Sequence, residues 1–188
     1  MTSSRMIRVA VLSTLAVGLL AACKGPAVPH RLTGQSRYLC CNVHYEKDEI
    51  NDANYQVGTL IPFGTHVDIL EVRKNKVRFA ATGHPPIWLE LNYGEKALTF
   101  DQYLDRIFVE EDPHKKLGKK FPAKTLKQIE AGQVEPGMTK DQVLMAIGYP
   151  AAHRTPTLEG STWHYWHNRW VQFDVYFDEH DRVVRVTR

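Results

Sequence analysis

The chain has 188 residues, with 24 Lys and Arg, 21 Asp and Glu, and a formal net charge of +3. Nucleic-acid-binding proteins usually carry a strong basic excess, so this near balance argues against nucleic acid as a partner. The length suits one ordinary domain or two small ones. The 10 prolines, 12 glycines and many aromatic residues favour a β-rich globular protein over a helical bundle.

The N-terminal end of the chain is predicted to be a signal peptide over residues 1–22. Arg5 and Arg8 give a short positive start, and an apolar stretch over residues 9–20 follows them. A charged start, an apolar core of this length and small residues at the cleavage point are typical of secretory signals. The stretch is short for a membrane-spanning helix, which needs about 20 apolar residues. We therefore expect this segment to be removed during export.

Residues 20–23 have the sequence Leu-Ala-Ala-Cys and resemble the lipobox of bacterial lipoproteins. In those proteins the cysteine thiol receives a diacylglyceryl group, and cleavage leaves the cysteine as the first residue. The resemblance implies that Cys23 is the lipidation site and that the chain binds a membrane through it. Two or three acyl chains give the stable anchoring that one chain cannot provide. Lys24 resembles the outer-membrane sorting pattern of enteric bacteria, which implies a lipid-anchored, periplasm-facing outer-membrane protein.

A β-rich domain is predicted to follow the anchor. Residues 23–37 are polar and rich in Gly and Pro, and we expect them to form a lipidated tether. Residues 38–112 hold short runs of alternating apolar residues with turn residues between them, which predicts a small antiparallel β-barrel or sandwich. Thr99 and Gln102 have the spacing of a capping box, so this barrel-like domain is expected to end in a helix.

The adjacent cysteines Cys40 and Cys41 leave several chemistries open. In an oxidising compartment they could bond to each other, remain free thiols or bridge two chains. Together with His44 they would supply three metal ligands, but a fourth ligand at a recognisable spacing is missing from the sequence. We therefore predict no metal site.

Residues 113–123 are predicted to be a solvated linker, because they are charged and contain Pro113 and Gly118. They also hold a basic run formed by Lys115, Lys116, Lys119 and Lys120. Each lysine near an anionic membrane surface adds about 1 kcal/mol of attraction. The run is therefore a candidate contact with anionic lipid head groups.

Residues 124–188 are predicted to form an α+β module of two helices followed by three antiparallel strands. Thr139 and Gln142 have capping-box spacing, and Gly148 stands where the C-cap of that helix needs a positive φ. The strand pattern alternates from residue 163 onward, which places Trp163 and Tyr165 in the core.

The C-terminal third resembles a known family. The segments that carry the resemblance are Ile129-x-x-Gly132, Pro136-Gly137-Met138-Thr139-Lys140-x-Gln142-Val143, Gly148-x-Pro150, Trp163-x-Tyr165 and Val175-x-Phe177-Asp178. They resemble the SmpA/OmlA (BamE-like) outer-membrane lipoprotein family, in which two helices pack on a three-stranded sheet. The family often has glycine in the last turn, where this chain has Asp181. The domain before the module is a second departure from the family.

The sequence contains no motif that indicates catalysis. A Gly-x-Ser-x-Gly nucleophile elbow, a His-Glu-x-x-His zinc helix and a glycine-rich phosphate loop are all absent from the sequence. His164 and His167 are three apart on a predicted strand and would point to opposite faces, which is unsuitable for one metal. We therefore predict that the protein is not an enzyme and has no catalytic residue, cofactor or metal.

A group of aromatic residues in the C-terminal module is the candidate binding surface. Trp166, Arg169, Trp170 and Tyr176 are predicted to share the outer face of the sheet and to bind a protein partner. The alternative is that the N-terminal domain covers these residues and makes a domain interface.

The sequence thus predicts a non-catalytic outer-membrane lipoprotein that binds envelope proteins and supports outer-membrane assembly or envelope integrity. The alternative is a cell-wall or small-ligand binding module that uses the N-terminal barrel. Enzyme inhibition is a third option, because the family fold resembles the repeat unit of β-lactamase inhibitor proteins. A shared fold does not fix function.

Overall fold

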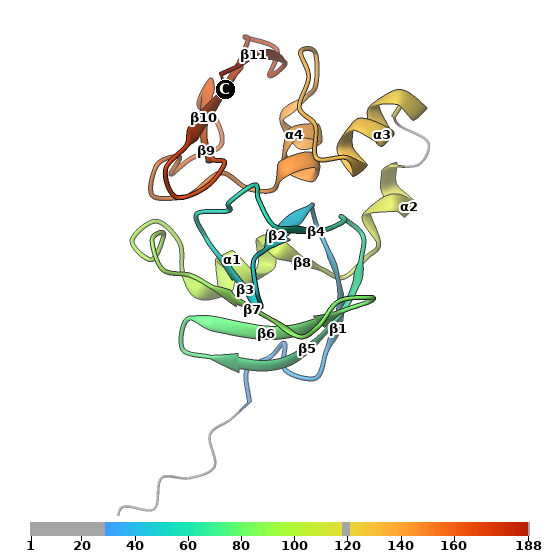
Figure 1. The fold of residues 1–188 in the computed structure, drawn as a ribbon, viewed down its shortest axis with the longest axis vertical. Helices are drawn as coiled ribbons and strands as arrows, with labels where there is room; N and C mark the ends of the chain where they lie inside the picture. Colours follow the sequence, from blue (N-terminus) through green and yellow to red (C-terminus); the bar gives the residue numbers. More distant parts are fainter. Residues whose placement is uncertain (1–28, 118–120, 188) are drawn as a thin grey trace, which may run out of the picture.

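The computed structural model describes residues 29–117 and 121–187. The predicted signal peptide, Cys23, Lys119 and Lys120 lie outside these residues. Figure 1 shows a curled N-terminal sheet in the lower half, with a smaller sheet and helices above it. The α+β class predicted from the sequence is confirmed at this level. Among the described residues, no helix has the length and apolar character needed to cross a membrane.

The N-terminal part is a curled sheet with helix α1 against it. Its elements are β1 (Ser36–Leu39), β2 (Val43–Tyr45), β3 (Glu49–Asn51), β4 (Thr59–Ile61), β5 (His66–Arg73), β6 (Lys76–Ala81), β7 (Ile87–Glu90), α1 (Phe100–Ile107), β8 (Phe108–Val109) and α2 (Pro113–Leu117). Six strands pair in the order β3-β7-β6-β5-β1-β8, and β2 pairs with β4. Alternating apolar residues on β5, β6 and β7 point inward, and the predicted capping box of Thr99 and Gln102 opens α1.

One strand pair departs from the predicted antiparallel arrangement, because β3 runs parallel to β7. Parallel neighbours need a long connection between them. Here the chain forms β4, β5 and β6 before it returns as β7, which supplies that connection.

The folded part begins earlier than the predicted boundary at residue 38. Leu32 is 2% exposed in the core beneath the sheet, and β1 begins at Ser36. His30 also contacts the α1 side chain Asp101 at 2.9 Å. Burial of one leucine in a run of polar residues has no periodic signal, so the sequence pattern did not reveal it. The predicted tether over residues 23–37 is shortened accordingly.

The stretch predicted to be a linker starts with helix α2. Asp112 caps this short helix by accepting a hydrogen bond from the His114 amide at 2.9 Å, and Pro113 follows at the first helical position. The His114 ring stacks on Phe63, with 4.3 Å between ring centroids. Helix α2 therefore packs through His114 on the segment after β4, at the seam between the two parts.

The C-terminal part combines helices with a three-stranded sheet. Its elements are α3 (Ala123–Glu130), α4 (Lys140–Ile147), β9 (Thr162–Trp166), β10 (Gln172–Phe177) and β11 (Val183–Val186), with strand order β11-β10-β9. The predicted capping box of Thr139 and Gln142 opens α4. Trp163 and Tyr165 are fully buried, as predicted. Asp181 adopts a left-handed conformation with φ 56°, so the last turn forms without the glycine of the family.

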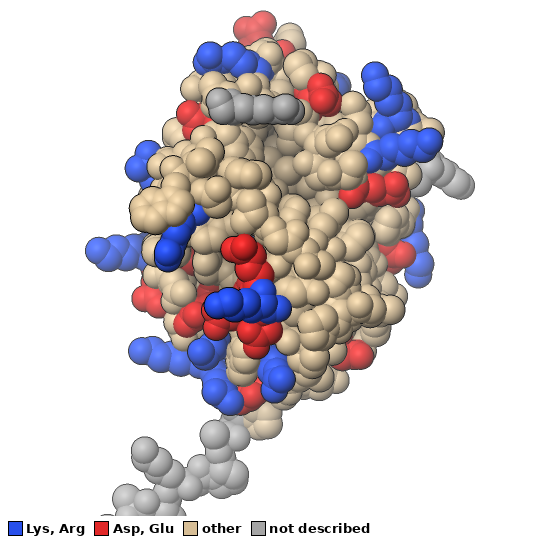
Figure 2. Space-filling model, in the orientation of Figure 1, with Lys and Arg blue, Asp and Glu red and all other residues tan. Residues whose placement is uncertain are grey.

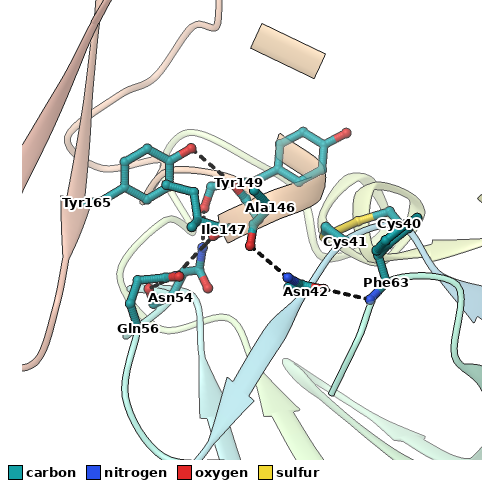
Figure 3. Close-up of a disulfide and its surroundings, with 11 residues drawn as sticks. Cys40, Cys41, Asn42, Asn54, Gln56, Phe63, Ala146, Ile147, Tyr149 and Tyr165 are labelled. Atoms are coloured by element: carbon teal, nitrogen blue, oxygen red, sulfur yellow. Dashed lines mark hydrogen bonds between the residues drawn. A yellow bond between two sulfur atoms is a disulfide. The ribbon is translucent and has the colours of Figure 1, made fainter. Parts of the chain in front are cut away.

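A buried asparagine joins the two parts (Figure 3). Asn42 lies between β1 and β2 and is fully buried. Its side-chain amide donates to the carbonyl of Ile129 in α3 at 2.7 Å and to that of Ala146 in α4 at 2.9 Å. Its side-chain oxygen accepts from the Phe63 amide at 2.8 Å. The side-chain amide group therefore donates twice across the interdomain seam, while the side-chain oxygen accepts a hydrogen bond within the N-terminal part.

The seam caps the C-terminal end of α4. The last four carbonyls of a helix have no partner within the helix. Here the Gly148 amide donates to the Leu144 carbonyl. The Asn42 backbone amide donates to the Met145 carbonyl, and the Asn42 side chain donates to the Ala146 carbonyl. Asn54 and Gln56 both donate to Ile147, at 2.7 and 3.0 Å. The N-terminal domain thus satisfies three of the four carbonyls.

Phe63 completes the seam by entering the C-terminal core. This residue follows β4 in the N-terminal domain, but its ring is 1% exposed and belongs to the cluster that contains Ile129, Ala146 and Trp163. The C-terminal module therefore takes one of its core side chains from the other part of the chain.

Candidate functional site

A cleft runs along the interdomain seam beneath the turn between β9 and β10. The turn approaches the N-terminal domain because the Gln56 amide donates to the Trp166 carbonyl at 3.1 Å. Three hollows of about 660, 550 and 310 Å³ adjoin there. They are continuous in their lining, since His44 borders the first two and Tyr55 and Arg169 border the first and third. We call these hollows together the seam cleft.

The largest hollow is bordered by the tip of the β9–β10 turn. Trp170 is 82% exposed, the highest value among the exposed large apolar side chains of the described residues. Asn168 fixes the turn by accepting from the Trp170 and Val171 amides at 2.8 and 3.0 Å. The Arg169 guanidinium lies 5.6 Å from the centroid of the Trp170 ring. The turn therefore presents an indole and a guanidinium to solvent.

The second hollow has apolar walls and unsatisfied polar atoms. Val134 and Phe173 line it together with His44 and Gln56. Within the described part of the chain, His44 Nδ1 and Gln56 Oε1 are buried and have no hydrogen-bond partner. Burial lowers the pKa of His44, and the nearby His167 lowers it further. This hollow thus has an apolar surface, and the unpartnered nitrogen of His44 and oxygen of Gln56 are buried in its lining residues.

The third hollow is aromatic. Tyr55, Tyr93 and Trp166 line it with His153 and Arg169. Trp166 Nε1 is buried and is without a hydrogen-bond partner among the residues that the structure describes. Burial raises the pKa of Tyr55, and its neighbour Tyr93 acts in the same direction. The Tyr55 hydroxyl is therefore kept in its neutral form beside the aromatic surface.

The structure brings three of the four predicted binding residues to the seam cleft. Trp166, Arg169 and Trp170 line it. Tyr176 lies four residues from the β10 partner of Trp166, about 13 Å along the strand. Its hydroxyl donates to Asp174 at 3.2 Å, and Arg185 lies 4.2 Å from its ring centroid. The register places Trp166 and Tyr176 on the same face of the sheet, opposite the buried Val175 and Phe177, but Tyr176 packs within its own sheet away from the cleft.

The distribution of charged side chains around the seam cleft indicates which kind of ligand it can bind. Figure 2 shows that Lys, Arg, Asp and Glu gather over the rim and lower part of this face, while the area between the C-terminal sheet and the helices is mostly uncharged. The second hollow has no charged residue in its lining. An uncharged ligand segment would therefore enter it without the cost of an unpaired buried charge.

The cysteines and histidines do not assemble a metal site in the structure. Cys40 and Cys41 are joined by a disulfide, which decides between the alternatives left open by the sequence. Within residues 29–117 and 121–187, no three His, Cys, Asp or Glu side chains gather where they could hold a metal ion. His164 contacts Asp174 at 2.6 Å, and His167 lies beyond the end of β9.

The lowered pKa of His44 predicts a pH dependence of stability. The unfolded chain takes up a proton at this residue near pH 6.5, whereas the folded chain does so only at lower pH. The unfolded state therefore binds more protons in that window, and the free energy of unfolding falls as the pH falls below about 6.5. We expect the free energy of unfolding of His44→Gln, measured by urea titration, to fall less than that of the wild type between pH 7.5 and 5.0. Equal slopes for the two proteins would contradict this assignment.

Comparisons with known proteins bear on the C-terminal module. Residues 123–187 match the family model described as the outer membrane protein assembly factor BamE domain. The match confirms the resemblance of the C-terminal third to the SmpA/OmlA (BamE-like) family. A comparison with curated proteins found no match, and a comparison with solved structures found none.

Proposed function

We propose that this chain is a non-catalytic lipoprotein of the outer membrane that faces the periplasm, binds envelope proteins and supports outer-membrane protein assembly. Cys23 is its lipidated residue. The match of residues 123–187 to the outer membrane protein assembly factor BamE domain is the observation that carries this proposal. The adjoining seam cleft supports a binding role.

Protein binding is assigned to the seam cleft because of its composition and exposure. Residues that dominate protein interfaces are enriched in Trp, Tyr and Arg, and they lie beside pockets that exclude water. Trp170 and Arg169 stand exposed at the border of the largest hollow, and Trp166 and Tyr55 lie within reach of it. An envelope protein with an uncharged, partly apolar segment fits this arrangement.

The alternative of a ligand site inside the N-terminal barrel-like domain has less support. The cavity between Cys41, Ile50 and Tyr149 has a volume of about 30 Å³. That volume accommodates one or two water molecules and no larger ligand. The hollows of the seam cleft are larger, and they offer a small ligand more room than this cavity does.

The proposal is tested by affinity purification of the full-length lipoprotein from crosslinked cells after membrane solubilisation. We expect enrichment of outer-membrane assembly proteins, read by mass spectrometry. Recovery of unrelated envelope proteins would support a binding role and contradict a role in outer-membrane assembly. Retention on purified sacculi without any enriched protein would favour the cell-wall alternative.

Variants of the β9–β10 turn test the binding surface. Trp170→Ala and Arg169→Ala are expected to reduce recovery of the crosslinked partner at least about tenfold, because such residues dominate interface energies. Both side chains are exposed, so the melting temperature should stay within about 2 °C of the wild type. Tyr176→Ala is the matched aromatic control outside the cleft, and it should retain recovery. Undiminished recovery with the Trp170→Ala variant would refute the site.

A further inference from the structure

We propose that the outer face of β5, β6 and β7 around Trp88 lies against the head-group layer of the membrane that holds the anchor. This surface is defined by Leu70, Arg73, Lys76, Arg78 and Trp88, and we call it the Trp88 platform. The inference rests on the proposed lipidation of Cys23 and extends it to a second membrane contact. The partner is the surface of a phospholipid bilayer that contains anionic lipid.

The anchor is close to the folded domain. Leu32 is buried in the core, and Arg31 pairs with Asp101 at 3.2 Å, so the fold holds the chain from about residue 30 onward. Only residues 23–28 separate the predicted lipidation site from the described chain. Even a fully extended segment of this length spans at most about 22 Å. The N-terminal domain must therefore stay near the bilayer surface.

The Trp88 platform has the composition of a membrane-interface surface. The side chains of Arg73, Lys76 and Arg78 surround the Trp88 ring, at 4.9, 5.4 and 5.8 Å from its centroid. Leu70 is 46% exposed beside an irregularity in β5. Tryptophan favours the boundary between water and lipid, and Lys and Arg can keep their charged ends at the head groups.

The platform lies at the end of the molecule where the described chain begins. Backbone hydrogen bonds join Ile69 to Gly34 and Gln35, at 2.8 and 2.9 Å, so β5 runs directly beside the start of the folded chain. Arg73 is four residues further along that strand, about 13 Å away. Figure 2 shows several Lys and Arg side chains at this lower end.

One acidic residue of the same face is paired with a cation, and another is hydrogen-bonded to a neutral amide. Glu71 pairs with Arg73 at 2.6 Å, and Glu90 accepts from the Asn75 amide at 3.3 Å. Glu49 on β3 marks the edge of the platform beside Trp88. The contact therefore combines an aromatic and an aliphatic side chain with the cations Lys76 and Arg78.

The basic run that begins at Lys115, which the sequence suggested as a lipid contact, does not lie on the same side as the Trp88 platform. Helix α2, which contains Lys115, lies near α3 at the other side of the N-terminal domain from the start of the described chain (Figure 1). The same view places the C-terminal module at the end opposite the start of the described chain. A membrane under the Trp88 platform would leave the C-terminal module facing periplasmic partners, and the largest hollow of the seam cleft, which Glu49 also lines, would open beside the platform.

Fluorescence quenching in vesicles tests this inference. The acylated full-length lipoprotein would be reconstituted into phosphatidylethanolamine vesicles containing about one quarter phosphatidylglycerol, with and without bromine on the acyl chains. Four tryptophans contribute to the emission. We expect Trp88→Phe to remove at least about half of the quenching seen with the wild type. Trp170→Phe, the matched control in the seam cleft, should remove none.

The outcomes separate the two proposals. Equal quenching of the wild type and Trp88→Phe on vesicles that carry the protein would contradict membrane contact through the Trp88 platform. The proposed lipidation of Cys23 would still stand. Failure of the protein to float with any vesicle would overturn both. A variant with Arg73→Gln, Lys76→Gln and Arg78→Gln keeps the indole, and we expect about twofold less quenching from it. Unchanged melting temperatures establish that these variants are folded.

Discussion

Replacement of Phe63 by alanine is expected to lower the free energy of unfolding by about 3–5 kcal/mol, the usual range for a buried phenylalanine. The ring is 1% exposed and fills the core of the C-terminal module, although it belongs to the N-terminal part of the chain. It also supports the stacked His114 of α2. The substitution would therefore leave a cavity in the core of the C-terminal module and remove a contact that holds helix α2. Equilibrium urea denaturation, followed by tryptophan fluorescence and circular dichroism, measures the effect.

Phe121→Ala is the matched control for this experiment. Phe121 is half-buried at the edge of the same cluster, so its removal should cost about 1–2 kcal/mol. In the wild type the two probes should give coincident transitions, because the seam makes the two parts one cooperative unit. Loss of stability by Phe63→Ala no larger than that by Phe121→Ala would show that the ring does not hold the two parts together.

Local signals explain why much of the fold could be predicted from the sequence. The capping boxes at Thr99 and Thr139 depend on residues three positions apart, and the structure confirms both. The burial of Trp163 and Tyr165 follows from alternation within one strand. Helix α2 was missed because five residues provide too short a pattern, and its stability comes from contact with Phe63.

The candidate site was predictable only where its residues lie together in the sequence. Trp166, Arg169 and Trp170 fall within five positions on one hairpin, and the structure places all three around the seam cleft. His44 and Gln56 could not be identified, because polar residues in short strands and loops are usually solvated. Their role in the cleft comes from neighbours such as Ile147, which is 91 residues from Gln56.

The anchor geometry and the seam together suggest why the extra domain precedes the BamE-like module. The N-terminal domain caps three carbonyls of α4 and supplies Phe63, so it fixes the module's orientation. A short connection to Cys23 would in turn fix that domain near the membrane. An envelope partner would then meet the seam cleft at a defined height above the bilayer, which a long flexible tether would not provide.

Asn42→Ala is expected to lower the free energy of unfolding by about 2–4 kcal/mol. The substitution leaves the Phe63 amide without its acceptor, and it removes the donor for the Ile129 and Ala146 carbonyls. Each buried polar group left unsatisfied costs about 1–3 kcal/mol, and entry of water at the seam would recover part of that loss. Urea denaturation of the variant provides the measurement.

Two further variants identify the origin of the Asn42 effect. Asn42→Asp keeps an acceptor for Phe63 but turns a carboxylate toward the carbonyls at the negative end of α4, so it should be at least as destabilising as alanine. Asn75→Ala removes two hydrogen bonds of 3.3 Å at a half-buried position and should cost about 1 kcal/mol. Because Asn42 holds the backbone of Phe63, the double variant with Phe63→Ala should lose less stability than the two single losses combined. Strict additivity would mean that the hydrogen bonds of Asn42 and the burial of Phe63 stabilise the seam independently.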